Sequence, residues 1–173
     1  MLENLTLVLG GASSGKSAFA EQLVTQSGAP RVYIATAQAF DDEMRAKIAA
    51  HLDQRGDNWR TMETPLDAAD ALADVAPNEV ALLDCATMWL SNHLLAESNL
   101  AAQTDRLLSA LATCKGRVVL VSNEVGLDVV PDNALARRFR DAQGKLNQQI
   151  AARANLAVLV VAGLPMVLKG TLP

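Results

Sequence analysis

The sequence predicts an α/β protein with a mostly parallel central sheet that is covered by helices on both faces. Short aliphatic or β-branched runs alternate with longer segments of helical period, and several of these runs are apolar on both faces. Strands that alternate with helices are joined by right-handed crossovers, which place the strands parallel in one sheet. The predicted strands are 5–9, 31–35, 80–84, 117–121 and 156–162, and the predicted helices are 16–26, 42–55, 66–75, 86–96, 100–113 and 133–154.

Length and composition predict a single domain over residues 1–173. Half of the 173 residues are apolar, enough for one well-covered core, and no repeat or Pro/Gly linker divides the chain. A net charge of −4 and few aromatic residues argue against nucleic acid as a partner. The chain starts without a basic leader, and the apolar segment 156–168 is too short to cross a membrane. Cys85 and Cys114 form no C-x-x-C pair, so we expect free thiols in a cytoplasmic protein.

A phosphate-binding loop is predicted directly after the first strand. The segment GGASSGKS fits the pattern G-x-x-x-x-G-K-[ST] between a predicted strand and a predicted helix, a context that disfavours an incidental glycine-rich turn. Backbone N–H groups and the helix N-terminus would bind phosphates, Lys16 would reach the β- and γ-phosphates, and the Ser17 hydroxyl would hold Mg²⁺. The motif predicts a P-loop NTPase (RecA-like) three-layer sandwich. Its nucleotide-binding residues would be Gly10, Gly11, Ala12, Ser13, Ser14, Gly15, Lys16 and Ser17.

Polar residues at two other strand ends extend the predicted nucleotide site. Asp84 ends the strand VALLD, where a Walker-B aspartate would meet the Mg²⁺ shell; the alternative is that it caps the helix beginning near Ala86. Asn123 and Glu124 follow the strand 117–121, at the edge where open α/β sheets bind ligands, although an ordinary polar turn is also compatible. The absence of an N-K-x-D sequence disfavours a signalling GTPase.

Two predicted helices carry residues whose role the pattern leaves open. In the helix 42–55, His51 lies beside an apolar stripe, and no residue at a suitable spacing pairs with it, so structural and catalytic roles both remain. In the helix 133–154, the arginines would contact phosphates or a neighbouring subunit, or form a solvated basic face. These arginines are Arg137, Arg138 and Arg140, and the buried stripe of the same helix is predicted to contain Leu135, Phe139, Leu146 and Ile150.

The chain resembles the bifunctional adenosylcobinamide kinase / adenosylcobinamide-phosphate guanylyltransferase family of cobalamin biosynthesis nearly from end to end. The P-loop block is generic to nucleotide-binding proteins, whereas the long second and fourth blocks are specific. The family commonly has arginine where this chain has Ser13, and glycine where it has Asp128, which leaves nucleotide affinity and preference open. The five blocks that carry the resemblance are 10–17, 33–65, 82–95, 121–151 and 160–170.

The resemblance implies two reactions in one site. ATP or GTP would phosphorylate the aminopropanol arm of adenosylcobinamide, and GMP from GTP would then pass through a covalent enzyme intermediate to the new phosphate, giving adenosylcobinamide-GDP and pyrophosphate. The guanylylated histidine of the family matches His51, whereas His93 has no such role. Glu63 and Glu124 match characteristic positions and are expected near the guanine, ribose or metal. The family also implies a homotrimer.

Two other functions would produce no guanylylated protein. One is a nucleotide-dependent switch or binding protein that hydrolyses its nucleotide slowly. The other is a small-molecule P-loop kinase that lacks the guanylyl step.

Overall fold

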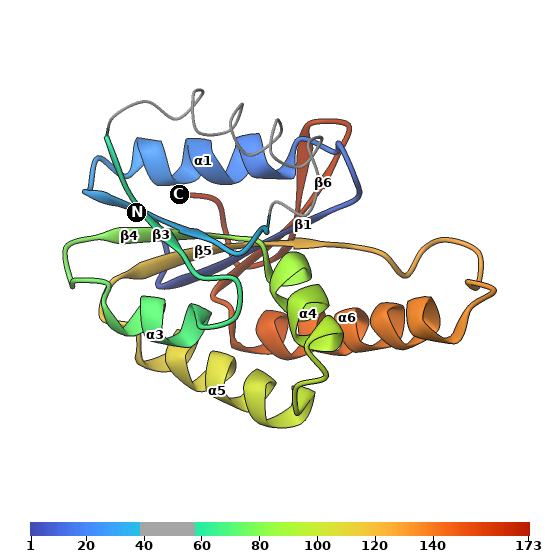
Figure 1. The fold of residues 1–173 in the computed structure, drawn as a ribbon. Helices are drawn as coiled ribbons and strands as arrows, with labels where there is room; N and C mark the ends of the chain where they lie inside the picture. Colours follow the sequence, from blue (N-terminus) through green and yellow to red (C-terminus); the bar gives the residue numbers. More distant parts are fainter. Residues whose placement is uncertain (39–57) are drawn as a thin grey trace.

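The computed structural model describes residues 1–38 and 58–173, and its centre is a seven-stranded sheet (Figure 1). The strand order is β3-β2-β4-β5-β1-β6-β7, and every neighbouring pair is parallel except β6 and β7. The predicted α/β class with a mostly parallel sheet is therefore confirmed. The strands are β1 Leu5–Gly10, β2 Arg31–Ala35, β3 Trp59–Glu63, β4 Val80–Asp84, β5 Arg117–Asn123, β6 Leu156–Val161 and β7 Leu164–Lys169.

Helices cover both faces of the sheet and make three layers (Figure 1). The helix α1 packs on one face, where its buried Ala20, Leu23 and Val24 join one apolar cluster. The other helices pack on the opposite face over a second, larger cluster. Among the described helices, none is long and apolar enough to cross a membrane. The helices are α1 Lys16–Gln26, α3 Ala68–Ala73, α4 Ala86–Leu95, α5 Leu100–Thr113 and α6 Ala134–Arg153.

The two edge strands of the sheet, β3 and β7, were not predicted from the sequence. β3 has the sequence WRTME and is partly exposed along its length, so it lacks the apolar run of a central strand. β7 follows β6 after a turn of only two residues, Ala162 and Gly163, with φ angles of 52° and 77° that suit a tight hairpin. The predicted helix 42–55 lies outside the described residues.

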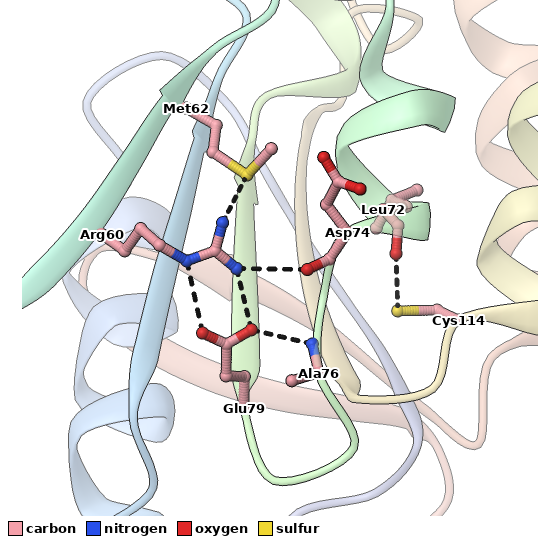
Figure 2. Close-up of polar contacts among 7 residues, drawn as sticks. All are labelled: Arg60, Met62, Leu72, Asp74, Ala76, Glu79 and Cys114. Atoms are coloured by element: carbon pink, nitrogen blue, oxygen red, sulfur yellow. Dashed lines mark hydrogen bonds and ion pairs between the residues drawn. The ribbon is translucent and has the colours of Figure 1, made fainter.

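An ion pair ties the edge strand β3 to the loop before β4, as Figure 2 shows. The Arg60 guanidinium lies 2.8 Å from the Glu79 carboxylate, which also accepts a hydrogen bond of 2.8 Å from the backbone amide of Ala76. The same guanidinium donates to the carbonyl oxygen of Asp74. The hydrogen bond from Arg60 lowers the pKa of Glu79 from its ordinary value.

The long helix α6 differs from the prediction in its first turns. Leu146 and Ile150 are buried as expected and Phe139 is partly buried, but the Leu135 side chain is 55% exposed. Figure 1 shows that the beginning of α6 extends beyond the ends of the labelled strands, on the side where the segment after β5 leaves the sheet. The apolar stripe of α6 is therefore buried only where the helix lies over the sheet.

Candidate functional site

The strand pairing brings several predicted site residues to one edge of the sheet. Across neighbouring strands, Glu63 is paired with Ala35, and Ala35 with Asp84. On the next two strands of the sheet, β5 and β1, Asn123 is paired with Gly10. All of these residues end parallel strands, so they lie on the carboxyl edge, where open α/β sheets bind their ligands.

The predicted phosphate loop connects β1 to α1 as a tight curl. Gly15 is the N-cap of α1 with φ at 90°, and Ser13 also has a positive φ of 54°. A side chain at Gly10 would place its Cβ 2.8 Å from the carbonyl oxygen of Val160 and against the Ser14 side chain, so only glycine fits there. The loop therefore presents backbone rather than side chains in front of a helix N-terminus, an arrangement that favours anions.

Lys16, the first residue of α1, folds back over this loop. Its ammonium group donates a hydrogen bond of 3.0 Å to the carbonyl oxygen of Gly11. The cationic group thus lies over the curl of backbone on which a phosphate would bind. Ser17 follows in the first turn of the helix and is half-buried.

The turn between β6 and β7 supports the phosphate loop from behind, a contact that sequence reasoning missed. The backbone amide of Gly163 donates a hydrogen bond of 2.8 Å to the carbonyl oxygen of Ser14. A Cβ on Gly15 would lie 3.1 Å from the Cα of Gly163, so the two glycines allow the turn and the loop to approach closely. In the sequence, only the pair Ala162-Gly163 between two apolar runs indicates a turn at this position.

Asp84 ends β4, and its carboxylate accepts a hydrogen bond of 3.2 Å from the Tyr33 hydroxyl. The N-cap of α4 is Cys85, whose sulfur accepts from the Met88 amide, so the alternative interpretation of Asp84 as this cap is wrong. Burial, with a smaller effect of the nearby Asp84, raises the pKa of the Cys85 thiol to about 11, and the charge of Lys16 opposes this rise. Lys16 and Asp84 therefore act electrostatically on the same thiol.

The end of β5 lies against the phosphate loop. The amide of Glu124 donates a hydrogen bond of 3.1 Å to the carbonyl oxygen of Gly10, and the amide of Asn123 donates one of 2.7 Å to the Thr87 hydroxyl. Asn147 on α6 donates a hydrogen bond of 3.0 Å to the Asn123 carbonyl oxygen. Both predicted residues are thus held beside the loop.

A buried amide network fixes this strand end to α6. The Asn147 side chain accepts from the Ser122 hydroxyl at 2.6 Å and from the Gln143 amide at 2.9 Å. The Gln143 amide also donates to the Ser122 hydroxyl at 2.9 Å. All three side chains are buried, so the network positions β5 in an environment with little competing water.

Three other candidate residues lie apart from the phosphate loop or outside the described residues. Glu63 is four strands away from β1, about 19 Å at the usual strand spacing, so it would contact a different part of a ligand. His93 is buried, packs against Trp89, and contacts the Leu66 carbonyl oxygen at 3.1 Å; burial lowers its pKa, in agreement with a structural role. His51 lies outside the described residues.

The arginines of α6 make local contacts. Arg137 donates hydrogen bonds of 2.9 and 2.8 Å to the carbonyl oxygens of Pro131 and Asp132, and Arg140 lies 3.6 Å from Asp141. Arg137 thus holds the end of the segment that follows β5, a role that neither sequence-based alternative included.

Solved structures with low sequence identity share this fold. RadB recombinase matches with a TM-score of 0.52 and 20% identity, covering 90% of this chain and 73% of that one. An ATPase from the type III secretion system of pathogenic bacteria matches with a TM-score of 0.56 and 12% identity, covering 95% and 56%. The predicted RecA-like P-loop fold is therefore confirmed.

Closer sequence relatives identify the family. The bifunctional adenosylcobalamin biosynthesis protein CobP of Pseudomonas aeruginosa is 48% identical over 167 residues, which cover 95% of this chain and 96% of that protein. The protein of the same description from Escherichia coli, CobU, is 42% identical over 181 residues, covering 95% and 99%. The family model described as cobinamide kinase / cobinamide phosphate guanyltransferase matches residues 6–168. With this match over nearly its whole length, the chain belongs to the cobinamide kinase / cobinamide phosphate guanyltransferase family.

Proposed function

We propose that this protein phosphorylates adenosylcobinamide with ATP or GTP and then transfers GMP from GTP to adenosylcobinamide phosphate. The observation that carries the proposal is the family match over residues 6–168, in a chain whose phosphate loop and Asp84 end strands on the same edge of the sheet. Both reactions displace an oxygen at a phosphorus atom of a nucleoside triphosphate, so one triphosphate site serves both.

In the kinase step, the curled backbone and the helix N-terminus bind the triphosphate. Lys16 exchanges its contact with the Gly11 carbonyl oxygen for the β- and γ-phosphates and neutralises the charge that develops there. The backbone amides that bind the phosphates come from the segment between Gly10 and Ser17, which includes Gly11, Ala12, Ser13, Ser14 and Gly15. The substrate hydroxyl attacks the γ-phosphorus, and the nucleoside diphosphate leaves.

A magnesium ion fits the groups at this edge. The Ser17 hydroxyl and the Asp84 carboxylate are oxygen ligands of the kind that Mg²⁺ prefers, and Mg²⁺ usually takes only one or two protein groups besides phosphate oxygens. When bound, Mg²⁺ would supply charge neutralisation for the phosphate oxygens. Tyr33 holds the Asp84 carboxylate by a hydrogen bond and thereby limits its rotation.

In the guanylyl step, His51 attacks the α-phosphorus of GTP and pyrophosphate leaves. A phosphate oxygen of adenosylcobinamide phosphate then attacks the same phosphorus, and the histidine is released. A neutral imidazole is a suitable nucleophile near pH 7, and the covalent relay divides one displacement into two easier ones. Glu63, at the far end of the same edge, would contact the guanine or ribose rather than the phosphates.

The remaining expectations belong to the same proposal. We infer a homotrimer from the family resemblance, and a cytoplasmic enzyme from the use of ATP and GTP and from the two cysteines, which are both free. The proposed partners are ATP, GTP and adenosylcobinamide, with no nucleic acid.

Radioactive labelling of the protein tests the guanylyl step. Incubation with GTP that carries a radioactive α-phosphate is expected to label the wild-type protein with an acid-labile bond, and addition of adenosylcobinamide phosphate should remove the label. The His51→Ala variant should remain unlabelled while it still phosphorylates adenosylcobinamide.

The other histidine provides the matched control. His93→Gln keeps a side chain that can hydrogen-bond to the Leu66 carbonyl oxygen, and it should be labelled like the wild type once folding has been checked by circular dichroism. Label that persists in His51→Ala would contradict the proposed nucleophile. If the wild-type protein phosphorylates adenosylcobinamide but is not labelled by the radioactive GTP, the protein is a kinase that lacks the guanylyl step.

A further inference from the structure

We propose that an apolar surface beside the phosphate loop binds the macrocycle of the corrinoid substrate. The surface comprises the segment after β5 and the groove between α4 and α6, and we call it the apolar platform. The inference rests on the proposed function for the substrate class, whereas the location is argued from the structure. The platform residues are Leu95, Leu127, Val129, Val130, Leu135 and Phe139.

Local hydrogen bonds fix the shape of the segment after β5. The carboxylates of Glu124 and Asp128 each accept a hydrogen bond of 2.7 Å from a backbone amide within two residues. The guanidinium of Arg137 bonds the carbonyl oxygens of Pro131 and Asp132. The polar groups therefore shape the segment.

The apolar side chains of this segment point into solvent. Leu127 is 87% exposed, Val129 84% and Val130 63%. Leu135 on α6 and Leu95 on α4 are exposed as well, and Arg137 holds the end of the segment at the beginning of α6. A group of exposed apolar side chains on a segment shaped by its own polar groups is typical of a binding surface.

A groove with a volume of about 330 Å³ continues the surface between α4 and α6. Leu94, Leu95, Leu135 and Phe139 contribute most of its lining. A groove of this volume would accommodate an edge or a substituent of a large ring. The exposed apolar side chains outside the groove would then pack against one face of that ring.

The platform begins where the phosphate acceptor must arrive. The amide of Glu124 is bonded to the Gly10 carbonyl oxygen, so the segment leaves the sheet directly beside the phosphate loop. In adenosylcobinamide the accepting hydroxyl is on an arm attached to the ring, and the ring must therefore rest within the length of that arm from the γ-phosphate.

The chemistry of a corrinoid fits this surface. The ring has broad apolar faces and carries amide groups around its rim. Apolar side chains would cover a face, and the Ser91 hydroxyl and the side-chain NH2 group of Asn133, whose oxygen caps α6, can hydrogen-bond to amides.

Another exposed apolar surface, on β7, suits a different kind of partner. Leu164, Met166 and Leu168 are exposed there. β7 is an edge strand, however, and its unpaired backbone groups favour another polypeptide rather than a ring.

Equilibrium dialysis of cobinamide, measured by its visible absorbance, tests the platform. We expect Leu127→Asn and Leu135→Asn each to weaken cobinamide binding about tenfold or more, because each removes an apolar side chain that the ring would bury. The matched control is Leu164→Asn on β7, which is similarly exposed and should bind cobinamide like the wild type. The dissociation constant for GTP should stay within about twofold in all three variants, since the uncharged substitution leaves the phosphate loop unchanged.

Three results would overturn the inference. The first is unchanged cobinamide binding in both platform variants, and the second is an equal loss in Leu164→Asn. The third is unchanged cobinamide binding together with a changed oligomeric state by light scattering, which would assign the platform to a second copy of the chain. A wild type that is guanylylated by GTP but neither binds nor phosphorylates cobinamide would instead refute the proposed substrate, and the platform with it.

Discussion

The backbone amide of Gly163 donates a hydrogen bond of 2.8 Å to the carbonyl oxygen of Ser14, joining the β6–β7 turn to the phosphate loop. Gly163 has a φ of 77°, which most side chains disfavour, and it lies 3.1 Å from the position of a Cβ on Gly15. The loop is thus supported by a hairpin from the other end of the chain, and its geometry should respond to changes in that turn.

Gly163→Pro should weaken nucleotide binding about tenfold, because it removes the amide and cannot adopt a positive φ. Gly163→Asn keeps the amide and tolerates the conformation, so its affinity should stay close to that of the wild type. Titration with GTP, with urea unfolding to confirm that both variants fold, measures the difference. Equal affinities in the two variants would show that the turn does not support the loop.

Lys16→Met should lower kcat/KM for the phosphorylation of adenosylcobinamide at least about a hundredfold, because a charge-assisted contact to the transferred phosphate is lost. Its stability should change little, since within residues 1–38 and 58–173 the ammonium group donates a single hydrogen bond, to the Gly11 carbonyl oxygen. Lys115→Met, at the opposite edge of the sheet, is the matched control and should retain activity. Steady-state kinetics decides between these outcomes, and similar losses in both variants would argue against the assigned role.

Asn147→Ala should destabilise the protein by roughly 2–4 kcal/mol. The substitution removes the hydrogen bonds that Asn147 makes with the Ser122 hydroxyl, the Gln143 side-chain amide and the Asn123 carbonyl oxygen. Gln148→Ala changes the next residue of the same helix, which is exposed, and should cost less than about 0.5 kcal/mol. Urea unfolding of the two variants measures the free energies. A small effect for Asn147→Ala would mean that water replaces the network.

Glu79→Gln should remove a pH-dependent part of the stability. Because Arg60 lowers the pKa of Glu79 from 4.5, the carboxylate stabilises the folded state above that pH, and this contribution is lost as the pH falls through the lowered value. The variant should therefore be less stable than the wild type at neutral pH, by about 0.5–1 kcal/mol for a partly exposed pair, and should approach it in acid. Unfolding measured from pH 7 to pH 3 tests this, and a constant difference would contradict it.

The central strands were predictable because burial on both faces leaves a clear apolar run. The strands 31–35 and 80–84 have the predicted bounds, and the helices 16–26 and 100–113 also agree. Edge strands lack this signal, since one side of their backbone has no partner strand in the described part of the chain, and both of them were missed. The predicted helix 66–75 is shorter in the structure, from Ala68 to Ala73.

The site was predictable where a residue's chemistry depends on its immediate sequence context. The phosphate loop and Asp84 each follow a recognisable strand, so their place on the carboxyl edge follows from the parallel sheet. The Gly163 contact and the Asn147 network depend on three-dimensional packing between distant segments, which spacing along the chain does not encode. The exposure of Leu135 likewise depends on where the sheet ends beneath α6.

The position of β1 between β5 and β6 also sets the order in which a newly synthesised chain can fold. Leu7 is paired with Leu120 on one side and Ala157 on the other, so β1 has neither neighbour when it leaves the ribosome. Such distant pairing slows folding and leaves apolar strands exposed in the meantime. The phosphate loop is therefore translated before both strands that flank β1 and is among the last segments to acquire its final shape.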